Sequence, residues 1–237
     1  MTFHYIGKPM YLHEEVLLLA LKDDSGKVDW KASFLEYIMA GALLAELLLE
    51  ERIEVSSDSK KLVTLTNSSH HENTVIDEAL DMIRKSRKDR GIQHWVTKLL
   101  SLKKLKEKTA KQLCRLGVLK EEESKILFIY TSKKYPELNP EPEQQLISRL
   151  REAITSENDV DIRTAALISL TYDTGILAIP FSKKELKASK KRLKDISSGE
   201  VIGEATEAAI NAIQATIAVI VIMPAITSAA SPPGGGC

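Results

Sequence analysis

The sequence predicts a mainly α-helical fold: a single globular multi-helix domain with short β-hairpins, packed around a buried apolar C-terminal helix. Segments of helix-forming residues with apolar stripes recur along the chain, and short β-prone segments are separated by polar turns. Hydrophobic residues make up 43% and charged residues 28% of the 237 residues, which is the ordinary balance of a folded domain. We therefore expect one domain over residues 1–226 and a disordered Pro- and Gly-rich tail over residues 227–237.

In the first half of the chain, apolar helices alternate with short strands. We expect helices over residues 11–21, 33–51, 74–87 and 93–116. We expect strands over residues 52–55, 62–66 and 126–131, with a polar turn over 56–60 and an acidic turn over 121–123. An apolar helix followed by strand, turn and strand thus occurs twice, and each occurrence is typical of a winged-helix unit.

The second half is predicted to be helical after a Pro-rich loop over residues 135–142. Helices are expected over residues 144–155, 160–174, 182–196 and 204–223, the last ended by Pro224. This last helix is nearly all apolar, but Asn211, Gln214 and Thr216 interrupt it, whereas a membrane span needs about 20 apolar residues. We interpret it as a core helix buried on all sides; a membrane span is the alternative.

Catalytic motifs are absent from the sequence. The five histidines do not form a zinc-binding pattern and are expected to be exposed. Cys114 is expected to be a buried structural thiol, and the pairs Glu14–Glu15 and Asp77–Asp81 are expected at helix starts or solvated faces. The two cysteines form no CxxC pair and no secretory signal begins the chain. We expect a cytoplasmic, non-enzymatic protein without a metal or a cofactor.

The most unusual charge pattern lies between Lys98 and Arg115. This segment holds seven cations and one anion, a local charge of +6 in a chain whose formal net charge is zero. On a helix, five residues would share one core-facing side and leave the lysines free: Leu102, Leu105, Thr109, Leu113 and Leu116. The lysines either bind an anionic partner or simply solvate this face.

Two apolar features accompany the lysine-rich segment. Trp30 lies in a polar loop, where its ring would suit a membrane interface, whereas Trp95 is expected in the core. The run ILFIY, residues 126–130, could insert into a bilayer as part of a hairpin, pair with another subunit, or form an inner core strand.

Several stretches together resemble the Golgi phosphoprotein 3 family of phosphatidylinositol-4-phosphate-binding peripheral membrane proteins, which includes bacterial relatives. The resemblance covers nearly the whole chain and is carried by EEVLLLALKDDSG, LLAELLLEERIEV, DEALDMI, HWV, KEKTAKQLCRLGVL and DIRTAALISLTYDTGIL. It implies a largely helical single domain, a shallow basic head-group pocket and a neighbouring hydrophobic hairpin that enters the membrane.

Carried over by position, the resemblance implies that Lys103 and Lys106 contact the head group, with Lys104 beside them and Trp30 as the pocket tryptophan. The membrane-inserting residues would be Ile126, Leu127, Phe128, Ile129 and Tyr130. The family's arginine on the second helix falls on Ala40, which cannot bind phosphate, so the identity of the lipid is left open.

The expected partner is therefore an anionic phospholipid, with phosphatidylinositol 4-phosphate as one candidate, bound reversibly on the cytosolic face of the Golgi if the source is eukaryotic. Self-association and a membrane-protein cargo are left open as further partners. The alternative function is nucleic-acid binding through the two winged-helix-like units. It is less favoured, because few residues of the basic helix are suited to reading bases, Gln112 being the main candidate.

Overall fold

The computed structural model describes residues 10–126, 130–203 and 207–229 and confirms a mainly helical fold with small antiparallel sheets. The helices are α1 (Leu12–Ala20), α2 (Leu35–Leu49), α3 (Thr74–Arg84), α4 (Ile92–Leu99), α5 (Leu105–Arg115), α6 (Glu141–Thr155), α7 (Ile162–Tyr172), α8 (Lys183–Ala188), α9 (Lys190–Ser197) and α10 (Glu207–Ala229). Two short 3₁₀ helices, η1 (Trp30–Ala32) and η2 (Ile176–Ala178), lie between them.

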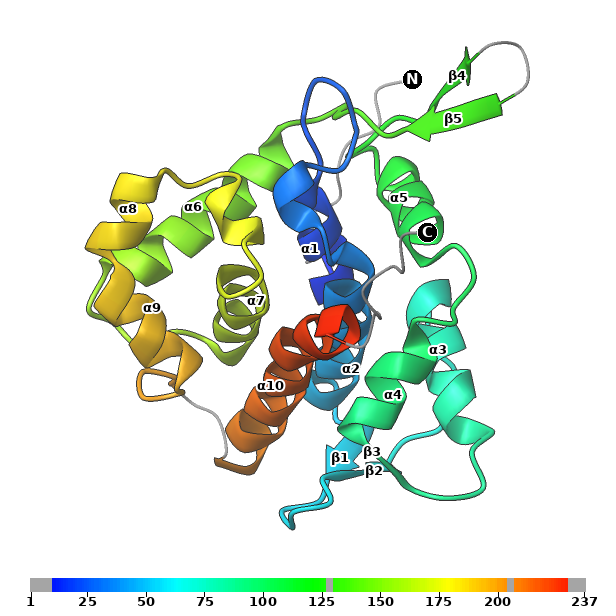
Figure 1. Cartoon of the computed structure of the whole chain (residues 1–237), viewed down its shortest axis with the longest axis vertical. Helices are drawn as coiled ribbons and strands as arrows, with labels where there is room; N and C mark the ends of the chain where they lie inside the picture. Colours follow the sequence, from blue (N-terminus) through cyan, green and yellow to red (C-terminus); the bar gives the residue numbers. More distant parts are fainter. Residues whose placement is uncertain (1–9, 127–129, 204–206, 230–237) are drawn as a thin grey trace, which may run out of the picture.

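Helices α1 and α2 form the centre of the domain. Every residue of α1 is buried, and α2 contacts α1, α3, α4, α5, α7 and α10 (Figure 1). A helix that is apolar on all sides has to be enclosed in this way, because any exposed side would leave hydrophobic surface in water.

The C-terminal helix α10 is less enclosed than the sequence suggested. It packs on α2 by one side, where Ile213, Ile217 and Ile220 are buried, whereas Asn211 and Ala218 are exposed. Alanine leaves little apolar surface in water, so an Ala-rich helix does not need cover all round. No helix in the described ranges combines the length and the hydropathy that a membrane span requires.

The predicted end of this helix is wrong by six residues. The backbone stays helical past Pro224 to Ala229, although a proline inside a helix removes one hydrogen bond and clashes with the preceding turn. Of the predicted disordered tail, residues 227–229 therefore belong to α10, and residues 230–237 lie outside the described residues.

The first predicted helix–strand–turn–strand unit is present, whereas in the second a β-hairpin follows α5 but its first strand includes residues that were expected to form the turn. After α2, strand β1 (Ile53–Val55) pairs antiparallel with β2 (Leu62–Leu65), and β2 pairs with the short β3 (Arg90–Gly91). After α5, β4 (Glu122–Ile126) pairs with β5 (Tyr130–Lys134). Strand β3 was not predicted, because two residues carry no readable alternation.

Two predicted helices are each divided into two. Residues 93–116 form α4 and α5, separated at Lys104, whose backbone is left-handed with φ of 60°. Residues 182–196 form α8 and α9, which meet at Ser189. Neither junction contains the glycine or proline that usually marks a helix end in a sequence, so both breaks were missed.

Candidate functional site

The turn between α4 and α5 places the predicted head-group lysines. Leu99 and Leu105 are buried on either side of the turn, and Leu100 and Leu102 within it pack partly against the core. Ser101, Lys103 and Lys104 are exposed. Lys103 and Lys104 therefore lie on this turn and not on a continuous helix, and Lys106 lies in the first turn of α5. This corrects the prediction that one basic helix presents all three.

Two shallow hollows bring these lysines to the start of α2. The first, of about 300 Å³, is lined by Glu36 of α2 and by the turn from Leu100 to Leu105. The second, of about 310 Å³, is lined by Lys106 and by residues preceding and opening α2, again including Glu36. The structure thus assembles Lys103, Lys104 and Lys106 around one helix end. Glu36 was missed from sequence, since an acid in a first helical turn is ordinarily explained by the helix dipole.

The lysines of this region differ in their partners. Lys104 lies 3.6 Å from Glu107, and Lys108 forms an ion pair with Glu78. Across the described ranges, neither Lys103 nor Lys106 forms an ion pair with a carboxylate. These two lysines therefore keep their charge available to an external anion.

Two exposed aromatic side chains lie beside the second hollow. Trp30, at the start of η1, is 76% exposed, and Phe34, which lines the hollow, is 44% exposed. The loop is held in place, because Lys31 Nζ donates a hydrogen bond to the carbonyl oxygen of Ala178 at 2.6 Å. Large apolar side chains on a fixed loop next to free cations suit an interface between water and lipid. Phe34 was not predicted; Trp95 is buried, as expected.

The loop before Trp30 is clamped to the segment that follows the β4–β5 hairpin. Gly26 has φ of 58°, and its carbonyl oxygen accepts a hydrogen bond from the Tyr135 N–H at 3.1 Å. The Glu137 N–H donates to the carbonyl oxygen of Asp23 at 3.1 Å. The loop over residues 23–26 is therefore tied by backbone hydrogen bonds to the segment that follows the hairpin, and this loop and the hairpin lie at the same end of the molecule (Figure 1).

The ILFIY run does not form a single strand. Ile126 ends β4 and Tyr130 begins β5, and these two residues pair; Leu127, Phe128 and Ile129 lie outside the described residues. The expected acidic turn is also wrong, because Glu122 and Glu123 belong to β4, opposite Lys134 and Lys133. These cross-strand charges stabilise the pairing, so the acids extend the strand where a turn was expected.

Ala40 takes no part in either hollow. It is fully buried within α2, so the position that the resemblance matched to the family's arginine faces the core in this chain. The basic hollows therefore depend on lysine.

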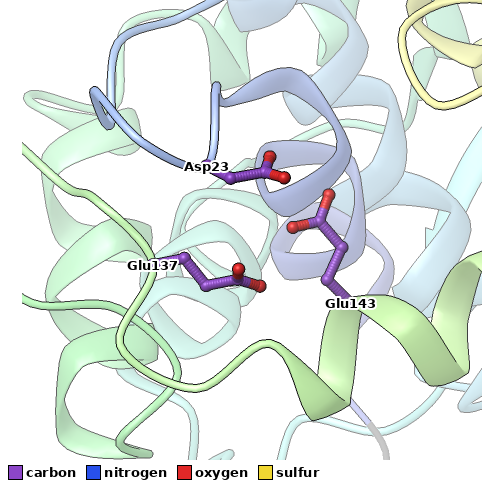
Figure 2. A group of neighbouring side chains, drawn as sticks. All are labelled: Asp23, Glu137 and Glu143. Atoms are coloured by element: carbon purple, nitrogen blue, oxygen red, sulfur yellow. The ribbon is translucent and has the colours of Figure 1, made fainter.

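Three carboxylates come together where the loop before Trp30 meets α6. Asp23, Glu137 and Glu143 each place an oxygen within 4.8 Å of the others, and Figure 2 shows the three side chains pointing toward one another. Burial, together with the charges of Asp23 and Glu137, raises the pKa of Glu143 to about 8. These residues could share a cation, and they could equally share a proton.

Several polar residues expected at the surface are buried. Glu14 and Glu15 are almost fully buried in α1, and burial raises the pKa of each to about 7. His13 is fully buried, and its ring nitrogens have no hydrogen-bond partner among the described residues. Burial and the nearby His71 lower the pKa of His13 to about 3, so it is neutral. Glu14 and Glu15 lie in the first turn of α1, as expected, but they are buried there; the expected exposure of His13 was wrong.

Cys114 is only half-buried, and not fully buried as predicted. Burial, with a contribution from Glu121, raises the pKa of its thiol to about 11. The thiol therefore stays protonated at neutral pH, which does not favour a role as a nucleophile.

Comparison with known proteins agrees with this architecture. The sequence model of the family described as Golgi phosphoprotein 3 (GPP34) matches residues 12–213. Among curated proteins, vacuolar protein sorting-associated protein 74 of Eremothecium gossypii is 27% identical over 166 residues, which is 62% of this chain and 50% of the relative. The chain thus aligns with about half the length of that relative. The family match over residues 12–213 includes all the residues that line the two basic hollows.

Proposed function

The chain belongs to the Golgi phosphoprotein 3 family, and on this premise we propose that it is a non-enzymatic peripheral membrane protein that binds anionic phosphoinositide-type head groups. Phosphatidylinositol 4-phosphate is one such head group. The binding domain extends beyond the expected boundary at residue 226 to the end of α10 at Ala229. Docking is reversible, from the cytoplasm and on the cytosolic face of the Golgi if the source is eukaryotic.

The observation that supports this proposal most directly is the pairing of free cations with exposed aromatic rings. Lys103 and Lys106 lack a carboxylate partner in the described part of the chain. Lys106 lines one hollow together with the exposed Phe34, and Lys103 lines the other hollow, which shares Glu36 with the first. Near an anionic membrane each lysine contributes about 1 kcal/mol of attraction. Two such lysines with one or two interfacial rings would give docking that is weak, reversible and sensitive to salt.

The lysines also bear on selectivity. Lysine binds phosphate as a point charge, whereas arginine offers a planar fork that recognises two oxygens at once. With Ala40 buried and Glu36 lining both hollows, the site would tolerate different anionic head groups. Insertion of hairpin residues 126–130 would add roughly 1.5 to 3 kcal/mol for each side chain that is fully buried in the bilayer.

Co-sedimentation with vesicles tests the proposal. Wild-type protein should pellet with phosphatidylcholine vesicles that contain phosphatidylinositol 4-phosphate or phosphatidylserine, and less so as salt is added. Lys103→Glu with Lys106→Glu should abolish pelleting. The matched control, Lys60→Glu with Lys88→Glu, makes the same change in net charge at exposed positions away from the hollows and should retain it.

Unchanged sedimentation of the Lys103/Lys106 variant would refute this site. A gel shift with duplex DNA at physiological salt addresses the alternative function: specific retardation would favour nucleic-acid binding. Gln112, the residue considered for base reading, already accepts a hydrogen bond from Arg115 at 3.2 Å.

A further inference from the structure

A second basic surface lies on helices α8 and α9. Between Lys183 and Lys194 the chain holds seven cations and one anion, a local charge of +6 that equals the charge of the Lys98–Arg115 segment. Six of these cations are exposed lysines, here called the α8–α9 lysines: Lys183, Lys184, Lys187, Lys190, Lys191 and Lys194.

The acids near these lysines leave them uncompensated. Glu185 caps the start of α8 through Ser182 and contacts Arg151 at 3.3 Å. Within the ranges that the structure describes, none of the α8–α9 lysines lies within 4.0 Å of a carboxylate oxygen. The seventh cation, Arg192, is occupied by the carbonyl oxygens of Ala153 and Asn158.

The apolar residues of α9 orient its lysines outward. Leu193 and Ile196 are buried, and α9 packs on α7 and α6. Where α9 meets the end of α7, a hollow of about 460 Å³ is lined by Tyr172, Asp173, Ser197 and three of the lysines. Because Asp173 is the only acid among its lining residues, this hollow is also suited to anionic groups.

The position of α8 relative to Trp30 suggests what this surface meets. Trp30 opens η1, η1 packs against η2, and η2 ends five residues before α8 begins. Lys31, next to Trp30, is hydrogen-bonded to Ala178 of η2. In Figure 1, α8 and α9 lie on one flank of α1 and α5 lies on the other. The segment that carries Trp30 is thus linked through η2 to the segment that leads into α8.

We propose that the α8–α9 lysines form a second contact surface for the anionic phospholipid bilayer, engaged together with the Lys103/Lys106 hollows. This inference rests on the proposed membrane function. Two separated basic surfaces would let one molecule bind two groups of lipid at once, so that the loss of either surface weakens the whole interaction more than its own contacts suggest.

The test compares two triple variants in co-sedimentation with vesicles of phosphatidylcholine containing phosphatidylserine. Lys184→Gln, Lys187→Gln and Lys191→Gln together remove three α8–α9 charges. Lys60→Gln, Arg87→Gln and Lys88→Gln remove three exposed charges elsewhere. We expect the first variant to bind roughly 10- to 100-fold more weakly, with a shallower dependence on salt, and the second to change less than about twofold.

The outcomes are distinguishable. If the α8–α9 variant binds like wild type while Lys103→Glu with Lys106→Glu abolishes binding, the second surface is refuted and the proposed function stands. If wild-type protein does not bind these vesicles at all, both proposals fail. If the α8–α9 variant keeps vesicle binding but loses retardation of a DNA duplex, the surface serves nucleic acid and the lipid assignment is overturned. Circular dichroism of each variant shows whether its helices are intact.

Discussion

Arg163 of α7 forms a two-point ion pair with Glu46, a carboxylate of α2 that is fully buried. The same carboxylate accepts a hydrogen bond from the backbone N–H of Leu12 at 2.6 Å, at the start of α1. One side chain thus joins three helices of the core. A buried carboxylate needs this combination of a charge partner and hydrogen-bond donors to offset its lost hydration.

Arg163→Met should therefore destabilise the fold strongly. It leaves Glu46 buried with its backbone donor alone, and breaking a buried pair costs about 3–5 kcal/mol. Urea unfolding followed by circular dichroism measures the change. Arg84→Met is the control: Arg84 pairs with the partly exposed Asp81, and such pairs contribute at most about 1 kcal/mol. Equal losses for the two variants would contradict a special role for the buried pair.

The helices of this core could be predicted because their signals are local. The apolar residues of α1 and α2 and the turn at Asp23–Gly26 are contiguous in sequence, and the predicted bounds lie within two residues of the observed ones. The burial of Glu14, Glu15 and His13 could not be predicted. It depends on partners far away in the chain, such as Asn73 and Arg149, and in sequence these residues resemble an ordinary acidic first turn.

Unfolding of the protein should depend on pH through Glu143. Its pKa is about 8 in the folded state, against an ordinary value of 4.5, so the folded state binds more protons than the unfolded state between these values. The free energy of unfolding should therefore fall as pH rises from about 4.5 to 8. Glu143→Gln should remove part of this slope and raise stability at pH 8 by about 1–3 kcal/mol.

Glu141→Gln provides the comparison for that measurement. Glu141 lies in the same first turn of α6 but is exposed, so its removal should leave the slope between pH 5 and 8 unchanged. The free energy of unfolding is measured by urea titration at pH 5 and pH 8 for the wild-type protein, Glu143→Gln and Glu141→Gln. If Glu143→Gln has the same effect at both pH values, ionisation of the buried Glu143 carboxylate is not the cause of the slope.

The candidate site could be predicted in composition but not in shape. The lysine-rich segment and Trp30 stand out in the sequence by charge and aromatic character, and the family resemblance singled out Lys103 and Lys106 within that segment. The turn at Lys104 was not, because it depends on Leu99 and Leu105 both finding places in the core. The α8–α9 lysines are visible in the sequence as charges. Their lack of a carboxylate partner among the described residues could not be predicted, because it depends on the binding of Glu185 to Ser182 and Arg151.

The close contact between α2 and α10 should be sensitive to a single methyl group. A Cβ atom at Gly41 would lie 1.8 Å from Ile220 Cδ1. Gly41→Ala should therefore cost about 1–3 kcal/mol through overpacking. In the double variant Gly41→Ala with Ile220→Ala, the new methyl group occupies space left by the isoleucine. The double variant should therefore lose less unfolding free energy than the sum of the losses of the two single variants. Losses that add within about 0.5 kcal/mol would argue against this contact.

Gly26 should link the stability of the Trp30 loop to membrane binding. Its φ of 58° disfavours any other residue, and a Cβ atom there would lie 2.1 Å from the backbone nitrogen of Pro136. Gly26→Ala should cost about 2–4 kcal/mol, because backbone strain is combined with a clash that no side chain can relieve. It should also displace the loop from the hairpin segment and weaken vesicle binding.

Gly175→Ala separates the two effects, since Gly175 has φ of 85° but its nearest neighbour, the Lys31 carbonyl oxygen, is 3.6 Å away. This control should lose about 1–2 kcal/mol from strain alone and keep its vesicle binding. Equal binding by both variants, measured by co-sedimentation under conditions where both are folded, would show that the clamp at Gly26 does not position Trp30 for the membrane.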